Sequence, residues 1–230
     1  MKFIKFVLSA PLQSWGEDAR WDQRTTAAFP TKSAIIGLIG CCMGLPRGDE
    51  RLNHLNDSLH IAVRADRAGQ ILTDFHTIQG TNGIFLNAEG KPRGGGSTII
   101  TPKQYLQDAR FTVFIWGAED ALGQCYFAML HPKWAVYLGR KSCVPSVPVY
   151  PHWAEAPTPL EAVRSFTQEE QTHSSDVVQV EMDALSNEKL SANERLISRR
   201  DNVIRSDRNE YDLRWVRAFT VRPGGERECI

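Results

Sequence analysis

The order in which strand-like and helix-like segments follow one another most limits the folds open to this chain. Residues 2–9 show the period of two that is expected of a strand with one face more buried than the other. Residues 20–30 show no sustained period and predict a loop. An apolar run then follows Thr31, whose side chain can accept a hydrogen bond from an early helical N–H, so we predict a helix over 32–44.

The next segments complete a recognisable order. Two β-rich runs, 61–66 and 71–78, are separated by an Ala-Gly pair and predict a hairpin. A strand over 110–116 precedes a helix that Asp120 can cap, and residues 135–138 resume an extended pattern. This order is that of the split βαβ folds, so the expected class is α+β with a ferredoxin-like or RNA-recognition-like βαββαβ domain.

The sequence pattern changes beyond residue 152. Residues 161–195 hold eight acids against three bases, whereas residues 196–227 hold eight arginines against five acids. We therefore predict one domain over 1–152 and a smaller, β-rich module over 153–230. Inside the first domain, the glycine-rich segment 80–102 has little to pack and predicts a mobile insertion.

The composition excludes several classes of protein. The chain has 230 residues, enough to bury a core, and its 27 basic and 27 acidic residues balance, so any nucleic-acid site must be a local patch. Its longest run of apolar residues and glycine, 34–45, is shorter than the roughly 20 residues that a membrane-spanning helix needs. Five cysteines without a C-x-x-C pair indicate reduced, core-filling thiols. We expect a cytoplasmic protein with no membrane partner.

No motif for metal or nucleotide chemistry is present in the sequence. The six histidines are never four residues apart, and the P-loop, the serine-hydrolase elbow and the dinucleotide-binding fingerprint are all missing. No metal, no cofactor and no catalytic residue is therefore predicted.

Basic residues cluster in two stretches that contain no acid. Residues 23–48 contain Arg24, Lys32 and Arg47, and residues 121–154 contain a further three bases. In the first turn of the predicted helix, Lys32 could help to bind a phosphate at the free N–H groups; the alternative is a solvated turn. The second stretch includes Arg140 and Lys141, which could approach a nucleic-acid backbone or could equally form a solvated turn.

Polar and aromatic side chains at strand ends suggest further contacts with RNA. Gln13, Ser14 and Trp15 follow the first strand and could read or stack on an unpaired base, although a buried tryptophan fits the sequence equally well. His76 could act as a general base that cleaves RNA through its 2′-hydroxyl, with Tyr105 or Lys103 assisting. The alternative is a histidine that only donates and accepts hydrogen bonds.

Several segments together resemble the CasD family, the type I-E subunit of the CRISPR surveillance complex Cascade, within the RAMP superfamily. The resembling segments occur in the same order and with similar gaps, at residues 11–16, 29–33, 37–40, 74–77, 105–113 and 137–143.

This resemblance implies an RNA-recognition-like domain with a long β-hairpin thumb, at about residues 79–104, and a small carboxy-terminal β module. It implies a subunit that binds the 5′ handle of the CRISPR RNA and contacts the large subunit and the backbone subunit. The subunit would contact target DNA only within the assembled complex. Members of this subtype are non-catalytic, whereas a related type I-C branch cuts RNA.

We therefore predict a non-catalytic subunit that binds an RNA end. The alternatives are a metal-independent endoribonuclease that processes the repeat and an assembly scaffold whose RNA contacts are incidental. The predicted RNA-binding residues are Gln13, Ser14, Trp15, Arg24, Lys32, Ser33, His76, Thr77, Tyr105, Arg110, Arg140 and Lys141.

Overall fold

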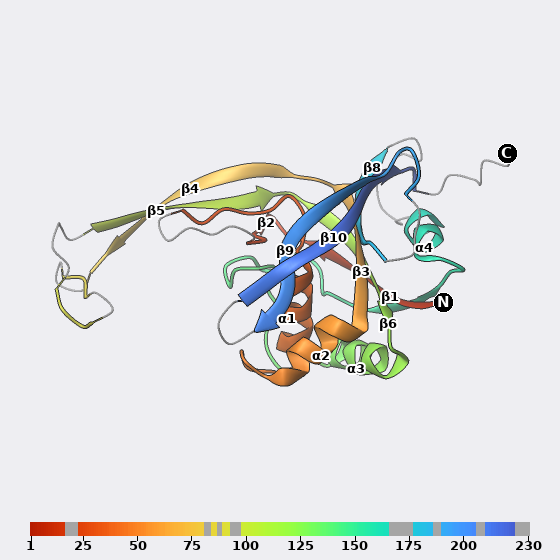
Figure 1. Cartoon of the computed structure of the whole chain (residues 1–230). Coiled ribbons are helices and arrows are strands. Elements are labelled where there is room, and N and C mark those ends of the chain that lie inside the picture. Colours follow the sequence, from red (N-terminus) through yellow and green to blue (C-terminus); the bar gives the residue numbers. More distant parts are fainter. Residues whose placement is uncertain are drawn as a thin grey trace.

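A computed structural model describes most of the chain and shows a curled sheet with a long hairpin that projects from it (Figure 1). The described residues are 1–16, 23–80, 84–86, 89–92, 98–165, 177–185, 190–205 and 210–223. Within them the strands form a seven-stranded sheet in the order β7-β1-β6-β3-β8-β10-β9 and a three-stranded sheet in the order β2-β5-β4.

The seven-stranded sheet is antiparallel throughout. Its strands are β1 (Lys2–Ser9), β3 (Leu59–Arg67), β6 (Arg110–Gly117), β7 (His152–Glu155), β8 (Val178–Asp183), β9 (Arg195–Arg205) and β10 (Glu210–Val221). Helices α1 (Lys32–Met43), α2 (Glu50–Ser58) and α3 (Glu119–Leu130) pack on one face, and α4 (Pro159–Ser165) packs on the other.

Two interleaved β-α-β units form the centre of this sheet. Strand β6 lies between β1 and β3, the two strands joined through α1, and β1 lies between β6 and β7, the two strands joined through α3. This is the split βαβ arrangement that the sequence predicts. The strand predicted over 135–138 is wrong, and β7 takes its place. Leu138 instead donates its backbone N–H to Cys143 within a tight loop, which withdraws that N–H from any sheet.

Helix α1 begins and ends as predicted. The Thr31 hydroxyl accepts the Ala34 N–H at 3.3 Å, and Gly44 ends the helix in the left-handed conformation at φ 70°. Helix α2 was not predicted, because its sequence is mostly polar and only two leucines, Leu52 and Leu55, face the core. A Cβ on Gly40 would lie 2.5 Å from the Leu52 side chain, so this glycine lets α2 pack closely on α1.

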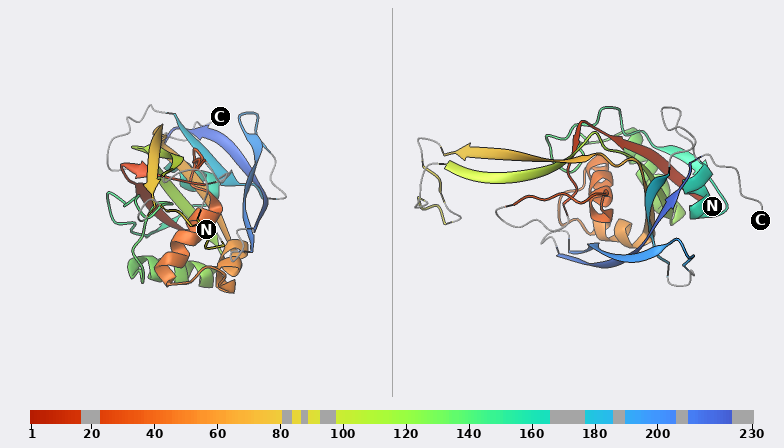
Figure 2. Two further views of the ribbon diagram at one scale, coloured as in Figure 1. Left: turned by 90° about the vertical axis from the view of Figure 1, so that its left-hand side faces the viewer. Right: turned by 90° about the horizontal axis from the view of Figure 1, so that it is seen from above.

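The projecting hairpin pairs β4 (Gln70–Gln79) with β5 (Thr98–Gln107), and the short β2 (Leu12–Gln13) joins it at its root. The right-hand view of Figure 2 shows its two arms extending away from the helices. The predicted pairing of 61–66 with 71–78 is wrong, because β3 pairs with β6 and β8 while β4 pairs with β5. The two strands belong to different sheets, and they also differ in burial: β3 is almost entirely buried, whereas β4 is mostly exposed.

The predicted insertion over 80–102 overlaps this hairpin. Its last five residues, 98–102, belong to β5 in a regular antiparallel ladder with β4. Residues 81–83, 87–88 and 93–97 lie outside the described residues. The hairpin thus begins nine residues earlier, at Gln70, than the start of the predicted thumb at residue 79.

The carboxy-terminal region is β-rich, as predicted, but its strands extend the main sheet. Strand β8 pairs with β3, and β7 pairs with β1. A second core on the α4 side of the sheet combines Phe3, Phe114 and Trp116 with Val163 and Met182. The boundary at residue 152 stays a prediction.

The end of this sheet curls back across the helices, so that β9 and β10 pass over α1 (Figure 1). The Asn56 side chain on α2 holds β9 in place, since it donates to Asn202 at 2.8 Å and accepts the Val203 N–H at 3.4 Å. The strand predicted over 213–221 is confirmed within β10.

The described cysteines are free thiols, as predicted. Burial raises the pKa of the Cys42 and Cys125 thiols to about 12, so they remain protonated and pack as small apolar side chains. Cys41 is half-buried, and Cys229 lies outside the described residues.

Candidate nucleic-acid interface

Three of the predicted RNA contacts follow β1 and belong largely to the interior. Gln13 and Trp15 are 0% and 1% exposed. Gln13 donates to the Ala109 carbonyl at 2.7 Å and accepts the Trp15 indole N–H at 3.2 Å. The structure therefore favours the alternative of a buried tryptophan, with no ring or amide free to contact a base. Ser14 is also buried, and its hydroxyl lies 3.4 Å from the Gln104 carbonyl oxygen.

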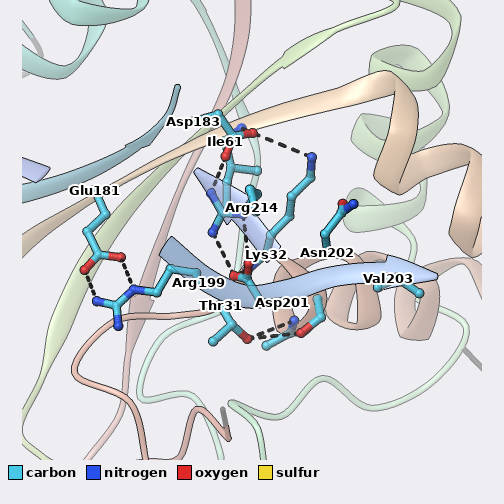
Figure 3. Close-up of polar contacts among 12 residues, drawn as sticks. Thr31, Lys32, Ile61, Glu181, Asp183, Arg199, Asp201, Asn202, Val203 and Arg214 are labelled. Carbon is cyan, nitrogen blue, oxygen red and sulfur yellow. Dashed lines mark hydrogen bonds and ion pairs between the residues drawn. The ribbon is translucent and has the colours of Figure 1, made fainter. Parts of the chain in front are cut away.

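Lys32 lies in a buried ion cluster at the amino terminus of α1 (Figure 3). Its backbone N–H donates to Asp201 at 2.7 Å, and its ammonium group lies 3.6 Å from an Asp183 oxygen. Arg214 bridges the two aspartates. The phosphate site predicted at this helix end is thus occupied by carboxylates of the chain itself. The solvated-turn alternative is also wrong, since Lys32 is 6% exposed.

Burial and charge act in opposite directions on the groups of this cluster. Burial lowers the pKa of Lys32, and the charge of Asp183 only partly opposes this effect. Burial also raises the pKa of Asp183, but its contacts with His60, Arg214 and Lys32 outweigh burial and hold this pKa below its usual value. The cluster ties the amino terminus of α1 to β8, β9 and β10.

A groove of about 1040 Å³ runs beside α1. Its walls come from α1, from Ser14, Gly16 and Arg24, from the loop around residues 134–144, and from the ends of β9 and β10. The polar and aromatic lining residues are Ser14, Arg24, Thr31, Ser33, Arg47, Trp134, Tyr137, Lys141 and Tyr211, and the remainder are apolar residues, glycines and Cys41.

The groove carries three cations and no carboxylate among its described lining residues. Arg24, Arg47 and Lys141 are all exposed to solvent. Trp134 is 48% exposed, and Tyr137 is half-buried in the same loop. Cations that attract phosphates, beside rings on which bases can stack, are the combination that binds single-stranded nucleic acid.

The structure brings four predicted RNA-binding residues together in this groove: Ser14, Arg24, Ser33 and Lys141. Arg47 and Trp134 were not predicted as contacts, although both lie in the two acid-free stretches, which was a usable signal. Tyr211 gave no such signal, because its place in the groove depends on the curling of the sheet.

Two predicted residues, His76 and Thr77, lie on the projecting hairpin and do not line the groove. Both ring nitrogens of His76 are engaged, since Nε2 lies 2.5 Å from Asp74 and Nδ1 lies 3.2 Å from the Lys103 ammonium. Thr77 is exposed.

The last predicted contacts lie at the hairpin root. Tyr105 is buried beneath the Arg140 guanidinium, which lies 4.6 Å from the ring centre. Arg140 donates to two backbone carbonyls, those of Gln104 and Arg24, each at 3.0 Å. Arg110 is half-buried at the start of β6, and its Nε has no hydrogen-bond partner among the described residues.

Comparison with known proteins identifies the family. A family model described as CRISPR-associated protein (Cas_Cas5) matches residues 3–229. The chain belongs to the Cas5 family. A relative in this family, the CRISPR system Cascade subunit CasD of Escherichia coli (strain K12), is 33% identical over 176 residues, which cover 71% of this chain and 76% of the relative. The predicted resemblance to CasD is therefore confirmed.

Solved structures support the same Cas5 assignment. A chain from a CRISPR RNA-guided surveillance complex matches with a TM-score of 0.76 and 28% identity, over 97% of this chain and 91% of the other. A second match, described as the crystal structure of a Cas protein, has a TM-score of 0.70 and 26% identity, over 96% and 95% of the two chains. In the described part of this Cas5 chain, no helix is long and apolar enough to cross a membrane.

Proposed function

We propose that this Cas5 chain is a non-catalytic subunit of a type I-E Cascade, and that its groove beside α1 binds the 5′ handle of the CRISPR RNA. The observation that carries the proposal is the lining of the groove, with three cations, three aromatic rings and no carboxylate among its described residues. The similarity to CasD and to a chain of a CRISPR RNA-guided surveillance complex supports it. Such a subunit would work in the cytoplasm.

The chemistry of the groove suits a single strand better than a duplex. Arg24, Arg47 and Lys141 would contact phosphates and set the position of the RNA, while Trp134 and Tyr137 would stack on unpaired bases. A duplex keeps its bases stacked on one another and would leave these rings without partners.

The projecting hairpin supports a role in assembly. Its arms expose apolar side chains, including Ile71, Phe75 and Ile100 at 61%, 65% and 53%. Exposed apolar side chains of this kind are typical of surfaces that become buried against a partner. We propose that the hairpin is the thumb and that the chain anchors the large and backbone subunits, meeting target DNA only in the assembled complex.

Binding of labelled handle RNA to the full chain, measured over a series of salt concentrations, tests the groove. Replacing Lys141 with Ala removes one phosphate contact, so the slope of log affinity against log salt should flatten by about 0.7. Arg164→Ala is the matched control, because this exposed arginine lies on α4, on the opposite face of the sheet. Equal slopes for the two variants would contradict the proposal.

The second candidate function is an endoribonuclease that cuts the repeat. The 3.2 Å contact between His76 and Lys103 favours it, because it brings together two of the three predicted participants. The third, Tyr105, is buried against Arg140. Incubation of the chain with labelled repeat RNA in the presence of a chelator separates the functions. A specific cut that His76→Ala abolishes would establish the nuclease instead.

A further inference from the structure

We infer that Arg140 is a positioning residue, which fixes the hairpin root to the wall of the groove and so places the two cations Arg24 and Lys141. This inference rests on the proposed function. Arg140 is one of two adjacent cations that the sequence alone cannot distinguish, and the structure assigns them different roles. The Arg140 side chain is already bonded within the chain. Its Nη1 donates to Gln104 and its Nη2 to Arg24, and its plane lies over the Tyr105 ring.

Arg140 joins two segments that are also bonded to each other. Arg24 pairs with β5 through two backbone bonds: its N–H donates to Pro102 at 3.1 Å, and its carbonyl accepts the Gln104 N–H at 2.8 Å. The same Arg24 carbonyl accepts from Arg140. The guanidinium therefore fastens the groove wall at Arg24 to the hairpin root at Gln104.

The loop that carries Arg140 is itself held close to the segment at Ser14. Ser14 donates its N–H to the Leu138 carbonyl at 3.1 Å. Gly139 has a φ of 90°, and a Cβ at this position would lie 1.6 Å from the Ser14 carbonyl oxygen. This glycine thus lets the loop approach the chain's own backbone at Ser14.

These contacts define a root junction, made of Ser14, Arg24, Gln104, Gly139 and Arg140. Two groove cations extend directly from it. Arg24 belongs to the junction through its backbone and has an exposed side chain, and the exposed Lys141 follows Arg140. Because the hairpin strand β5 enters the same junction, the orientation of the hairpin and the position of these two cations are coupled.

The salt dependence of RNA binding distinguishes positioning from direct contact. Loss of a phosphate contact flattens the salt slope by about 0.7 for a single strand. Looser positioning of cations that still reach their phosphates lowers the affinity without removing a contact. We expect Arg140→Ala to bind handle RNA about tenfold more weakly with an unchanged slope, and Lys141→Ala to flatten the slope. A slope for Arg140→Ala that flattens as much as that of Lys141→Ala would overturn the inference and leave the proposed function standing.

Arg140→Lys keeps the charge but lacks the planar fork that reaches two carbonyls and stacks on a ring. It should therefore bind RNA as weakly as Arg140→Ala, and full affinity in this variant would also overturn the inference.

If Arg140→Ala fails to fold, hydrogen exchange of the Arg140→Lys chain decides whether Arg140 is a positioning residue. The segments 23–26 and 102–107 should exchange faster than in the parent, and unchanged exchange would contradict positioning. If neither Lys141→Ala nor Arg24→Ala affects RNA binding, the proposed function itself fails.

Discussion

At the scale of single residues, several side chains that resemble nucleic-acid contacts are used inside the protein. Trp15 and Gln13 bond to each other in the core, and Lys32 is enclosed by aspartates. Lys141 and Arg24 remain exposed in the groove. Lys32 and Lys141 are both lysines in stretches without acids, and it is burial that separates their roles.

The buried ion cluster predicts a pH dependence of stability. Asp183 has a lowered pKa in the folded chain, so its charge stabilises the fold above the unfolded value of 3.8, and this contribution is lost as the pH falls through the lower folded value. Asp183→Asn leaves Lys32 and Arg214 with one fewer carboxylate and should destabilise the chain by about 3–5 kcal/mol at pH 7.

Urea unfolding between pH 7 and pH 2 measures this effect. The stability difference between the parent and Asp183→Asn should shrink towards the acid end of the range. Glu155→Gln is the control, because this exposed carboxylate on the edge strand β7 has no such cluster around it among the described residues. A difference that stays constant over the whole range would show that the charge of Asp183 does not stabilise the fold.

At the scale of elements, the glycines of α1 serve different purposes although they look alike in the sequence. Gly40 lies under Leu52 of α2, and Gly44 ends the helix. Gly37 is exposed along the groove, and a Cβ built on it has no atom within 4 Å. Close packing therefore requires a glycine at residue 40 and not at residue 37.

Alanine substitutions in α1 should separate these roles. Gly37→Ala should stabilise the chain by about 1 kcal/mol, because alanine favours a helix interior and the space is open. Gly40→Ala gains the same helix propensity but brings a methyl group to within 2.5 Å of Leu52, so it should give no net stabilisation or should destabilise. Thermal unfolding compares the two variants. Equal shifts in Tm would mean that the contact between α1 and α2 has room for the added methyl group.

At the scale of the whole molecule, the carboxy-terminal strands complete both the sheet and the groove. Strand β8 pairs with β3, and Tyr211 and Val203 line the groove beside α1. The second core also depends on this region, because Phe114 and Trp116 pack against residues of β8, β10 and α4. The groove is thus built from segments that lie at both ends of the sequence.

Truncation tests whether residues 1–152 form a domain that folds alone. The shortened chain loses β8 from the edge of β3 and exposes the apolar side chains of the second core. We expect it to be insoluble or to lack a cooperative unfolding transition, as measured by circular dichroism during heating. A soluble fragment with a sharp transition would instead support the predicted boundary at residue 152.

The sequence alone determined the elements whose signals are local. The alternation of β1, the Thr31 cap of α1 and the central part of β10 follow from interactions within a few residues, which composition and spacing encode directly. The order of these elements also indicated the split βαβ centre, because few topologies accommodate it.

Only the tertiary structure decided which strands pair and which charges meet. The pairing of β4 with β5 and the bond from Lys32 to Asp201, 169 residues away, arise from long-range packing. No local period records such contacts, since their free energy depends on which surfaces the folded chain brings together and shields from water. For the same reason the sequence showed that the chain has cations, but the fold determined which of them face the groove.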